Sequence, residues 1–385
     1  MRFTLLTGPA LPYLIGAFVA AAVLAFVLTP LVRRVALHVD AVDHPDHRRV
    51  NIVPIPRGGG VAVATAFIVV AIVFTVANSQ LEFLPTPASI DPVSLVGLLL
   101  GGALAAAFGV IDDSFDLRAR WQFAAQLALA AIAIGSGIMI EFLTDPFGPG
   151  VIELATPVAI GFTVLWIAGM INSINFIDGL DGLSSGVVLI AAITLGLISL
   201  TLVSQPFVAV LCFALAGALL GFLRWNFHPA TVFVGTSGVM FMGYTLAALS
   251  ILGTAKVAVA LLVLAVPIID AFWIIVRRLV QRRSPFSPDR GHLHHRLLDV
   301  GLSHRQTVVL IYGICMALGA LSLLLSGAGQ LLAFLGVFVL IGLALLALSR
   351  FSLDDGGEGR EVERDAERDI EREEGRSTAQ TSRTG

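Results

Sequence analysis

The stretch from Leu11 to Leu31 reads LPYLIGAFVAAAVLAFVLTPL. It carries no charged side chain, and about 20 mostly apolar residues are enough for a helix to cross a lipid bilayer. The run is too long for the core of a signal peptide, and no convincing small-residue cleavage site follows it. It therefore predicts a retained membrane-spanning helix near the start of the chain.

The composition extends this prediction to most of the chain. Of the 385 residues, 57% are hydrophobic and 13% are charged, whereas roughly a quarter are charged in soluble domains. Of the 51 charged residues, 17 lie in 351–385. We therefore expect a membrane-embedded domain over 1–350 and a charged cytoplasmic tail, helical or disordered, over 351–385. This excludes a soluble enzyme, a nucleic-acid-binding module and a disordered scaffold for the main domain.

Ten further apolar runs resemble the first. They are 59–77, 93–111, 122–140, 155–171, 183–203, 206–223, 238–253, 256–276, 307–326 and 329–349. We predict an all-α polytopic membrane protein with about eleven transmembrane helices. The fifth and eighth runs are short and adjoin polar motifs, which suggests broken or tilted helices there.

The basic residues predict the orientation. Arginines concentrate in the loops 33–58, 112–121 and 277–306, while the connections 78–92 and 141–154 contain no Lys or Arg. Since basic loops stay in the cytoplasm, the N-terminus is expected outside. All eight histidines and the paired carboxylates then fall on the cytoplasmic side. A transporter would scatter polar groups through the midplane of the membrane. Here the predicted midplane is almost bare of them, with Asp270 as the main exception. We therefore expect an active site at the cytoplasmic face.

Residues 112–116 read DDSFD at the end of the third run. A spacing of four would put Asp112 and Asp116 on one helix face. Clustered carboxylates repel one another unless a cation is present, and Mg²⁺ suits carboxylates and a substrate phosphate. The alternative is a solvated helix end.

Residues 172–182 read NSINFIDGLDG between the fifth and sixth runs. A polar residue recurs at every third position, namely Asn172, Asn175, Asp178 and Asp181. Amides and carboxylates in such a stripe can recognise a nucleotide or a sugar. The alternative is a capped loop of turn-forming residues.

Three other cytoplasmic segments carry donors for anions. Residues 289–296 read DRGHLHHR, and their imidazole and guanidinium groups suit a diphosphate better than a zinc ion. The alternative is a basic loop that contacts anionic lipid headgroups. Residues 54–60 read PIPRGGG, without the ending of a nucleotide-hydrolysing loop. Residues 225–238 read WNFHPATVFVGTSG, where Phe233 could stack on a base and the glycines could admit a phosphate. Together these groups favour phosphoryl transfer from a soluble nucleotide-linked donor to a lipid-linked acceptor.

These motifs, in this order over roughly 40–305, resemble the polyprenyl-phosphate N-acetylhexosamine-1-phosphate transferases, the glycosyltransferase family 4. The carboxylate run ending in Asp116 is similar to the branch that uses UDP-N-acetylglucosamine (UDP-GlcNAc). The resemblance implies transfer of GlcNAc-1-phosphate to undecaprenyl phosphate, with release of UMP. It implies Mg²⁺ as cofactor, with Mn²⁺ as an alternative, and a location in the bacterial cytoplasmic membrane. It implies no nucleic-acid partner and leaves a homodimer open.

The resemblance also suggests residue roles. The catalytic set is Asp112, as base for the lipid phosphate, with Asp113 and Asp178. The metal set is Asp112, Asp113, Asp116 and Asp178. The substrate-binding set is Arg49, Arg57, Asn172, Asn175, Asp181, Asn226, Phe233, Arg290, His292, His294 and His295.

Three positions depart from the family pattern. Thr236 stands where the family usually has a metal-binding Asp, Asn51 where His is usual, and Arg49 where Lys is usual. A threonine hydroxyl is a weak neutral ligand. The alternatives are therefore a different UDP-N-acetylhexosamine as donor, or a catalytically weakened homologue that binds or regulates lipid-linked sugars.

Overall fold

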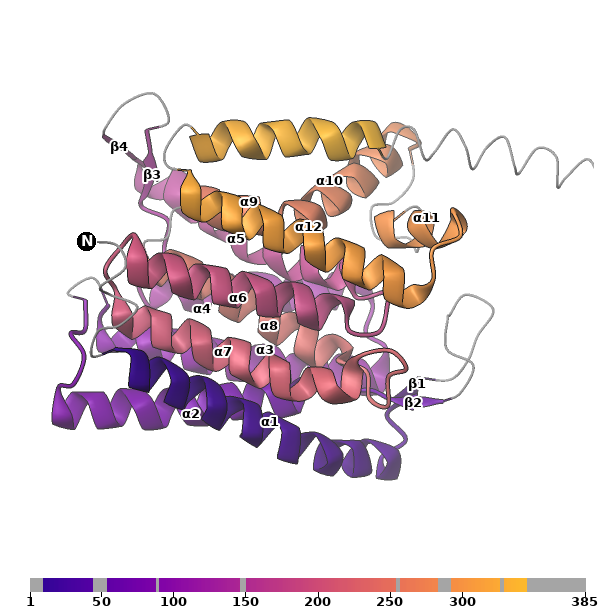
Figure 1. Ribbon diagram of the computed structural model, residues 1–385, viewed down its shortest axis with the longest axis horizontal. Helices are drawn as coiled ribbons and strands as arrows, with labels where there is room; N and C mark the ends of the chain where they lie inside the picture. The colour runs from indigo at the N-terminus through magenta and orange to yellow at the C-terminus, as the bar shows by residue number, and fades with distance from the viewer. Residues whose placement is uncertain are drawn as a thin grey trace, which may run out of the picture. The chain divides into compact units, whose positions relative to one another are not determined.

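The computed structural model describes residues 10–43, 54–87, 90–145, 150–253, 257–282, 292–325 and 329–344. The chain to Phe338 forms one compact unit, and the remainder from Val339 belongs to a second. The predicted tail 351–385 lies outside the described residues. The helices are α1 (Leu11–His38), α2 (Gly60–Leu81), α3 (Pro92–Phe115), α4 (Ala119–Gly135), α5 (Thr156–Ile177), α6 (Leu183–Thr201), α7 (Pro206–Asn226), α8 (Gly235–Leu252), α9 (Val257–Val263), α10 (Ala265–Val280), α11 (Leu293–Asp299) and α12 (His304–Leu324) (Figure 1).

Eight of the described helices are long and apolar enough to cross a membrane. They are α1, α2, α3, α5, α6, α7, α8 and α12. The helix α4 is shorter, with 17 residues, and a further apolar helix spans Gly329–Ala344. The prediction of an all-α polytopic membrane protein is confirmed, while the count of eleven and the orientation stay predictions.

The ninth predicted run, 256–276, does not form one helix. The structure divides it into α9 and α10, with Leu264 between them in a non-helical conformation. Pro267 explains the break, because proline has no N–H to bond to the carbonyl four residues earlier and its ring clashes with that carbonyl. The fifth and eighth runs were expected to be broken or tilted, and neither is broken, since α5 and α8 are continuous within the described residues.

Helices α7 and α8 form the centre of the first unit. Helix α7 packs on α1 and α6, and α8 packs on α3 and α5. The start of α8 is held especially closely. A Cβ atom added to Gly109 of α3 would lie 2.2 Å from the Cα of Ser237, and one added to Gly60 of α2 would lie 2.0 Å from the Cα of Gly238. The absence of side chains at these glycines lets α2 and α3 approach the first turn of α8.

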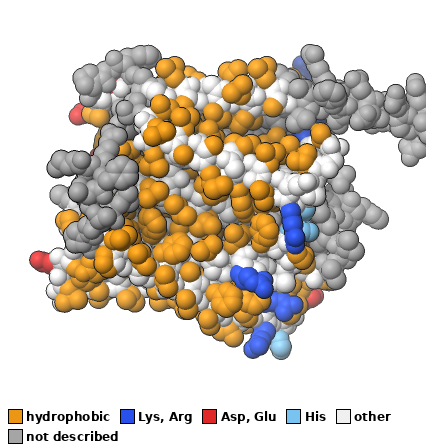
Figure 2. Space-filling view, in the orientation of Figure 1, with side chains coloured by type: hydrophobic (Ala, Val, Ile, Leu, Met, Phe, Trp, Pro, Cys, Tyr) orange, Lys and Arg blue, Asp and Glu red, His pale blue; other side chains and the backbone are white. Residues whose placement is uncertain are grey.

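Two short hairpins interrupt the helical fold. One pairs β1 (Val42–Asp43) with β2 (Ile55–Pro56), and the other pairs β3 (Phe142–Thr144) with β4 (Val151–Glu153). In Figure 1 the hairpin β1–β2 and the helix α11 lie at one end of the helices, and β3–β4 lies at the other. Figure 2 shows a surface of hydrophobic side chains over the helices, with arginines and histidines gathered at the end that bears β1–β2. Such a surface is typical of contact with lipid.

Candidate active site

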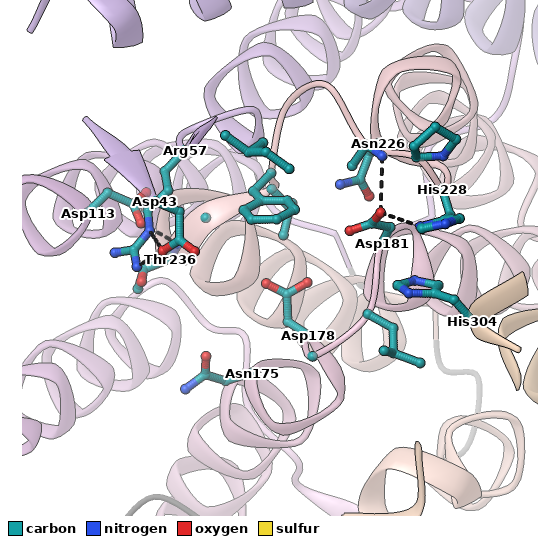
Figure 3. A pocket seen from close by; sticks show the side chains of 18 of the residues that line it. Asp43, Arg57, Asp113, Asn175, Asp178, Asp181, Asn226, His228, Thr236 and His304 are labelled. Carbon is teal, nitrogen blue, oxygen red and sulfur yellow. Dashed lines mark hydrogen bonds and ion pairs between the residues drawn. The ribbon is translucent and has the colours of Figure 1, made fainter. Parts of the chain in front are cut away.

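A cavity of about 530 Å³ opens at the end of the helices that bears β1–β2 (Figure 3). Eight of the residues nominated from the sequence line it, namely Arg57, Asp113, Asn175, Asp178, Asp181, Asn226, Phe233 and His295. Segments far apart in the chain therefore converge on one pocket, as phosphoryl transfer would require. Arg49 and Arg290 lie outside the described residues, as does Asn51.

Asp113 joins the end of α3 to the start of α8. Its Oδ1 accepts a hydrogen bond from the backbone N–H of Thr236 at 2.8 Å, and its Oδ2 accepts one from the N–H of Ser237 at 3.1 Å. These N–H groups have no partner within the helix, and the partial positive charge of the helix N-terminus favours a carboxylate there. Gly235 has a φ of 70°, and a Cβ atom there would lie 2.6 Å from Asp113 Oδ2. Glycine at this position is what lets the carboxylate approach.

Asp112 faces another direction. Its Oδ1 accepts hydrogen bonds from the N–H of Leu117 at 3.1 Å and from the side-chain amide of Gln122 in α4 at 2.9 Å. The residue is 5% exposed and is absent from the lining of the cavity. Asp112 is therefore adjacent to the pocket and turned toward α4.

Asp116 does not share a helix face with Asp112, contrary to the expectation from their spacing. Helix α3 ends at Phe115, and Asp116 follows it in a left-handed conformation with φ of 45°. Its side chain is 91% exposed and lies 3.5 Å from Arg57. Residues four apart share a face only within a continuous helix, and α3 ends one residue before Asp116.

The stripe beginning at Asn172 is divided between packing and the cavity. Asn172 donates to Gln126 Oε1 of α4 at 2.8 Å and to the carbonyl of Ala168 at 2.8 Å, so it joins α4 to α5. It does not line the cavity, whereas Asn175 does. Both lie in α5, which continues through the polar motif to Ile177.

Asp178 follows the end of α5 and lies within the cavity. Burial raises the pKa of its carboxyl group to about 7. A hydrogen bond of 2.6 Å from Ser184 opposes this rise, and the nearby charges of Asp113 and Asp181 add to it. Burial is the main cause of the rise, and the two neighbouring carboxylates add to it.

Asp181 and Asn226 fix the loop between α7 and α8. Asp181 Oδ2 accepts from the N–H of Ala230 at 3.0 Å. Asn226 donates to the carbonyl of Val232 at 3.1 Å, and its Oδ1 accepts from Ser185 at 2.8 Å. The loop is thereby held so that Phe233, near its end, borders the cavity.

Phe233 is anchored by its backbone. Its N–H donates to the carbonyl of Pro56 at 2.9 Å, and its carbonyl accepts from the N–H of Gly59 at 2.9 Å. These bonds join the glycine run after β2 to the start of α8. The ring is half-buried and borders the cavity, where an aromatic face can stack on a planar ligand.

Arg57 is paired before any ligand arrives. Its Nε donates to Asp43 Oδ1 at 2.7 Å, and one of its terminal nitrogens contacts the same oxygen. Asp43 was not nominated from the sequence. It stands opposite Ile55 in the hairpin β1–β2, which brings it beside Arg57. This pairing orients the guanidinium group at the cavity wall.

The three nominated histidines of the loop 277–306 have different surroundings. His292 Nδ1 lies 2.8 Å from Asp270 Oδ2, and Asp270 Oδ1 accepts from the N–H of Leu293 at 2.8 Å. Asp270 of α10 therefore caps α11. Burial lowers the pKa of His294 well below its usual range, and the neighbouring His295 adds to the effect. Of the three, only His295 lines the cavity.

Two further histidines lie at the cavity and were not nominated from the sequence. His228 belongs to the loop after α7, and His304 is the first residue of α12. Nδ1 of His228 lies 2.8 Å from Asp181 Oδ2, and the rings of His228 and His304 stack with centroids 4.1 Å apart. The predicted position of all the histidines on one side of the membrane was the available signal, but no local motif joins these two.

The fold and the cavity define a class: a multi-pass membrane protein whose apolar helices carry a pocket of carboxylates, amides and imidazoles at one end. Residues 95–254 match the model of glycosyl transferase family 4. The chain is 33% identical to a probable undecaprenyl-phosphate N-acetylglucosaminyl 1-phosphate transferase of Bacillus subtilis, over 85% of this chain and 89% of the relative. It is 36% identical to a decaprenyl-phosphate N-acetylglucosaminephosphotransferase of Mycolicibacterium smegmatis, over 84% and 86%.

A third relative is an undecaprenyl-phosphate alpha-N-acetylglucosaminyl 1-phosphate transferase of Escherichia coli, 29% identical over 72% of this chain and 75% of the relative. The chain belongs to glycosyl transferase family 4, among the polyprenyl-phosphate N-acetylhexosamine-1-phosphate transferases. The resemblance inferred from the motifs is thus confirmed.

Proposed function

We propose that the protein transfers GlcNAc-1-phosphate from UDP-GlcNAc to undecaprenyl phosphate at the cytoplasmic face of a bacterial inner membrane. An oxygen of the lipid phosphate attacks the β-phosphorus of the donor. The bond from that phosphorus to the bridging oxygen breaks, and UMP leaves with the oxygen. The product is the lipid-linked first intermediate of a cell-surface glycan. The observation that carries the proposal is the convergence of Asp113, Asp178 and Asp181 on one cavity with Phe233 and His295.

The carboxylates of the cavity fit a hard divalent cation. Carboxylate oxygens are the ligands that Mg²⁺ prefers, together with substrate phosphate. Burial is the main cause of the raised pKa of Asp178, and the charges of Asp113 and Asp181 add to it; a cation bound among these three carboxylates would favour their ionised forms. In this proposal Asp113 and Asp178 hold the ion, with the Thr236 hydroxyl nearby. When bound, Mg²⁺ would neutralise the charge that develops on the diphosphate.

The remaining roles divide between the two substrates. Asp112 would take the proton of the lipid phosphate, because its Oδ2 has no hydrogen bond from the described residues and the residue does not line the donor cavity. Phe233 would stack on the uracil ring, and Asn175 and Asp181 would bind the nucleotide or the sugar. Arg57 and His295 would donate to the diphosphate.

The test measures UMP release by the purified full-length chain in detergent. UDP-GlcNAc and undecaprenyl phosphate are supplied with Mg²⁺, with Mn²⁺, or with a chelator, and decaprenyl phosphate replaces the acceptor in a parallel series. A panel of UDP-N-acetylhexosamines tests the donor. We expect metal-dependent UMP release with UDP-GlcNAc as the best donor. A higher rate with another donor sugar would overturn the donor assignment, and a higher rate with decaprenyl phosphate would overturn the acceptor assignment.

Thr236 favours a second candidate, a homologue with weakened catalysis that binds or regulates lipid-linked sugars. The N–H of Thr236 bonds to Asp113, but its hydroxyl cannot replace the charge of an Asp. Saturable binding of UDP-GlcNAc without UMP release, in the presence of Mg²⁺ and acceptor, would support this candidate over the first.

A further inference from the structure

Three side chains at one side of the cavity form a compact group that the proposed reaction does not use as a unit. They are Asp181 from the loop after α5, His228 from the loop after α7, and His304 from the start of α12. One ligand atom of each lies within 4.8 Å of the others. In Figure 3 this group lies across the cavity from Asp113 and Thr236. We propose that Asp181, His228 and His304 bind a divalent transition-metal ion of the Zn²⁺ type.

His304 supplies the main argument. Both nitrogens of its ring are buried, and neither makes a hydrogen bond of ordinary distance and angle with the described residues, although the backbone of Asp181 lies near the ring. A buried imidazole that serves only for packing usually has a partner for at least one nitrogen, because an unsatisfied polar atom is costly. The ring is held against His228 by stacking, with an interplanar angle of 21°. A ring fixed in this way, with a nitrogen unused, is suited to ligate a metal.

The contact between His228 and Asp181 supports the same conclusion. Nδ1 of His228 lies 2.8 Å from Asp181 Oδ2, and this short contact requires a proton between the two atoms. A metal ion bound by the same atoms would displace that proton from Nδ1, and the neutral imidazole would then carry it on Nε2. The side chains are 36% and 15% exposed, so an ion can reach them from the cavity.

The ligand types select the metal. Two imidazoles and one carboxylate suit Zn²⁺ and related ions, whereas Mg²⁺ prefers oxygen ligands throughout. The group therefore differs in chemistry from the carboxylates around Asp113 and Asp178. With three protein ligands, a fourth position of the ion is left for water or a phosphate oxygen in the cavity.

Such an ion would join three segments that converge from distant parts of the chain. Arg305 already donates to the carbonyl of His228 at 3.1 and 3.3 Å, so α12 and the loop after α7 are in contact. A metal bond would add a second connection and include Asp181. The ion would thereby stiffen the cavity wall on which Asn226 and Phe233 depend.

The experiment measures metal binding on the full-length protein in detergent, without substrates, so its outcome is independent of turnover. After treatment with a chelator, Zn²⁺ is titrated in competition with a fluorescent zinc chelator, and bound zinc is counted by elemental analysis. We expect one ion per chain. His304→Gln and His228→Gln should weaken binding by at least ~100-fold, since even indirect partners of a metal contribute 10–100-fold. His38→Gln, at the end of α1, is the control and should bind as the unmodified protein does.

Two further readouts separate ligation from folding. Zn²⁺ should raise the melting temperature of the unmodified protein, with a shift that grows with the logarithm of the Zn²⁺ concentration above Kd, but should not raise that of His304→Gln. His304→Cys keeps a ligand and should give a thiolate-to-metal charge-transfer band with Co²⁺, which a folded and loaded site alone produces. The proposal is overturned if zinc binds no better than to an apolar control protein. It is also overturned if binding is lost in His295→Gln and kept in His304→Gln, or if the cysteine variant shows no such band.

Discussion

Asp112 and Asp113 are consecutive residues of α3 whose carboxylates bond to different helices. Asp113 accepts the N–H groups of Thr236 and Ser237 at the start of α8, and Asp112 accepts the amide of Gln122 in α4. Successive residues of a helix point about 100° apart, so one turn of α3 serves two surroundings. In the proposed reaction, this arrangement would let one motif serve the soluble donor through Asp113 and the lipid acceptor through Asp112.

We predict that Asp113→Asn lowers the rate of UMP release by at least ~100-fold, the effect typical of losing one key electrostatic group in an active site. Asparagine offers one acceptor oxygen, so its amide would oppose the N–H of Thr236 or Ser237, and its neutral group would hold Mg²⁺ weakly. Both the rate and the Mg²⁺ concentration at half-maximal rate are measured. Asp91→Asn, at the other end of α3, is the matched control. Equal rates in the two variants would contradict the prediction.

We predict a different pattern for Asp112→Asn. The loss of a general base should slow UMP release by ~10²–10⁴-fold, while binding of UDP-GlcNAc with Mg²⁺ stays unchanged. Asparagine at 112 can still accept from Gln122, so the fold should be kept. Titration calorimetry measures donor binding separately from turnover. Full activity in this variant would remove Asp112 as the base.

The carboxyl group of Asp178 should make the free energy of unfolding depend on pH. Its pKa of about 7 in the folded protein lies above the ordinary aspartate value of 3.8, so the folded protein holds the proton when the unfolded chain has released it. The stabilisation from this group is complete below 3.8 and is lost as the pH rises to about 7. We expect the melting temperature without divalent ions to fall more between about pH 5 and 7.5 than it does in Asp178→Asn.

Added Mg²⁺ provides the companion measurement. Because the ion needs the ionised carboxyl group, it should raise the melting temperature more above pH 7 than at pH 5 in the unmodified protein. In Asp178→Asn this difference should be smaller. Identical pH profiles for the two proteins would show that Asp178 does not titrate in this range.

Variants of Thr236 test whether its neutral side chain weakens metal binding. Thr236→Asp adds a carboxylate beside Asp113 and should lower the Mg²⁺ concentration needed for half-maximal UMP release by about tenfold, equivalent to ~1.4 kcal/mol. Thr236→Val keeps the shape and removes the hydroxyl, so it should raise that concentration if the hydroxyl touches the ion. Unchanged metal dependence in both variants would mean that this side chain takes no part in metal binding.

The approach of α3 to α8 gives a prediction about stability. In Gly109→Ala the new Cβ would lie 2.2 Å from the Cα of Ser237. Backbone cannot yield as a flexible side chain does, so overpacking should cost about 1–3 kcal/mol and displace the partners of Asp113. Gly161→Ala is the control, because no atom lies within 4 Å of its added Cβ. Thermal unfolding in detergent should separate the two, and equal melting temperatures would contradict the account.

The sequence predicted most of the helices because their apolar runs are long and uninterrupted. The boundaries were less certain where polar residues continue a helix, as Asn172 and Asn175 do in α5. The break before α10 has a visible cause in Pro267, which a count of apolar residues ignores. Long apolar runs predicted the helices, whereas no comparable sequence pattern predicted the hairpins β1–β2 and β3–β4.

Residues of the site could be predicted from the sequence where several of them belong to one local motif. Asp113, Asp178 and Asp181 could be nominated from local clusters, and they meet in the cavity. His304 and His228 could not be paired in this way, because only the packing of α12 brings them together. The different surroundings of His292, His294 and His295 also follow from burial, which a run of adjacent histidines does not reveal.

Asp270 anchors the start of α11 to α10. It is 1% exposed, within the broken pair α9–α10, and its two oxygens secure His292 and the first N–H of α11. The start of α11 is therefore held by a carboxylate set among apolar helices. His295 of α11 and His304 of α12 line the cavity and follow Asp270 in the chain, whereas Asp113, Asp178 and Phe233 precede it. During synthesis, the lining of the cavity is therefore incomplete until the chain has passed His304.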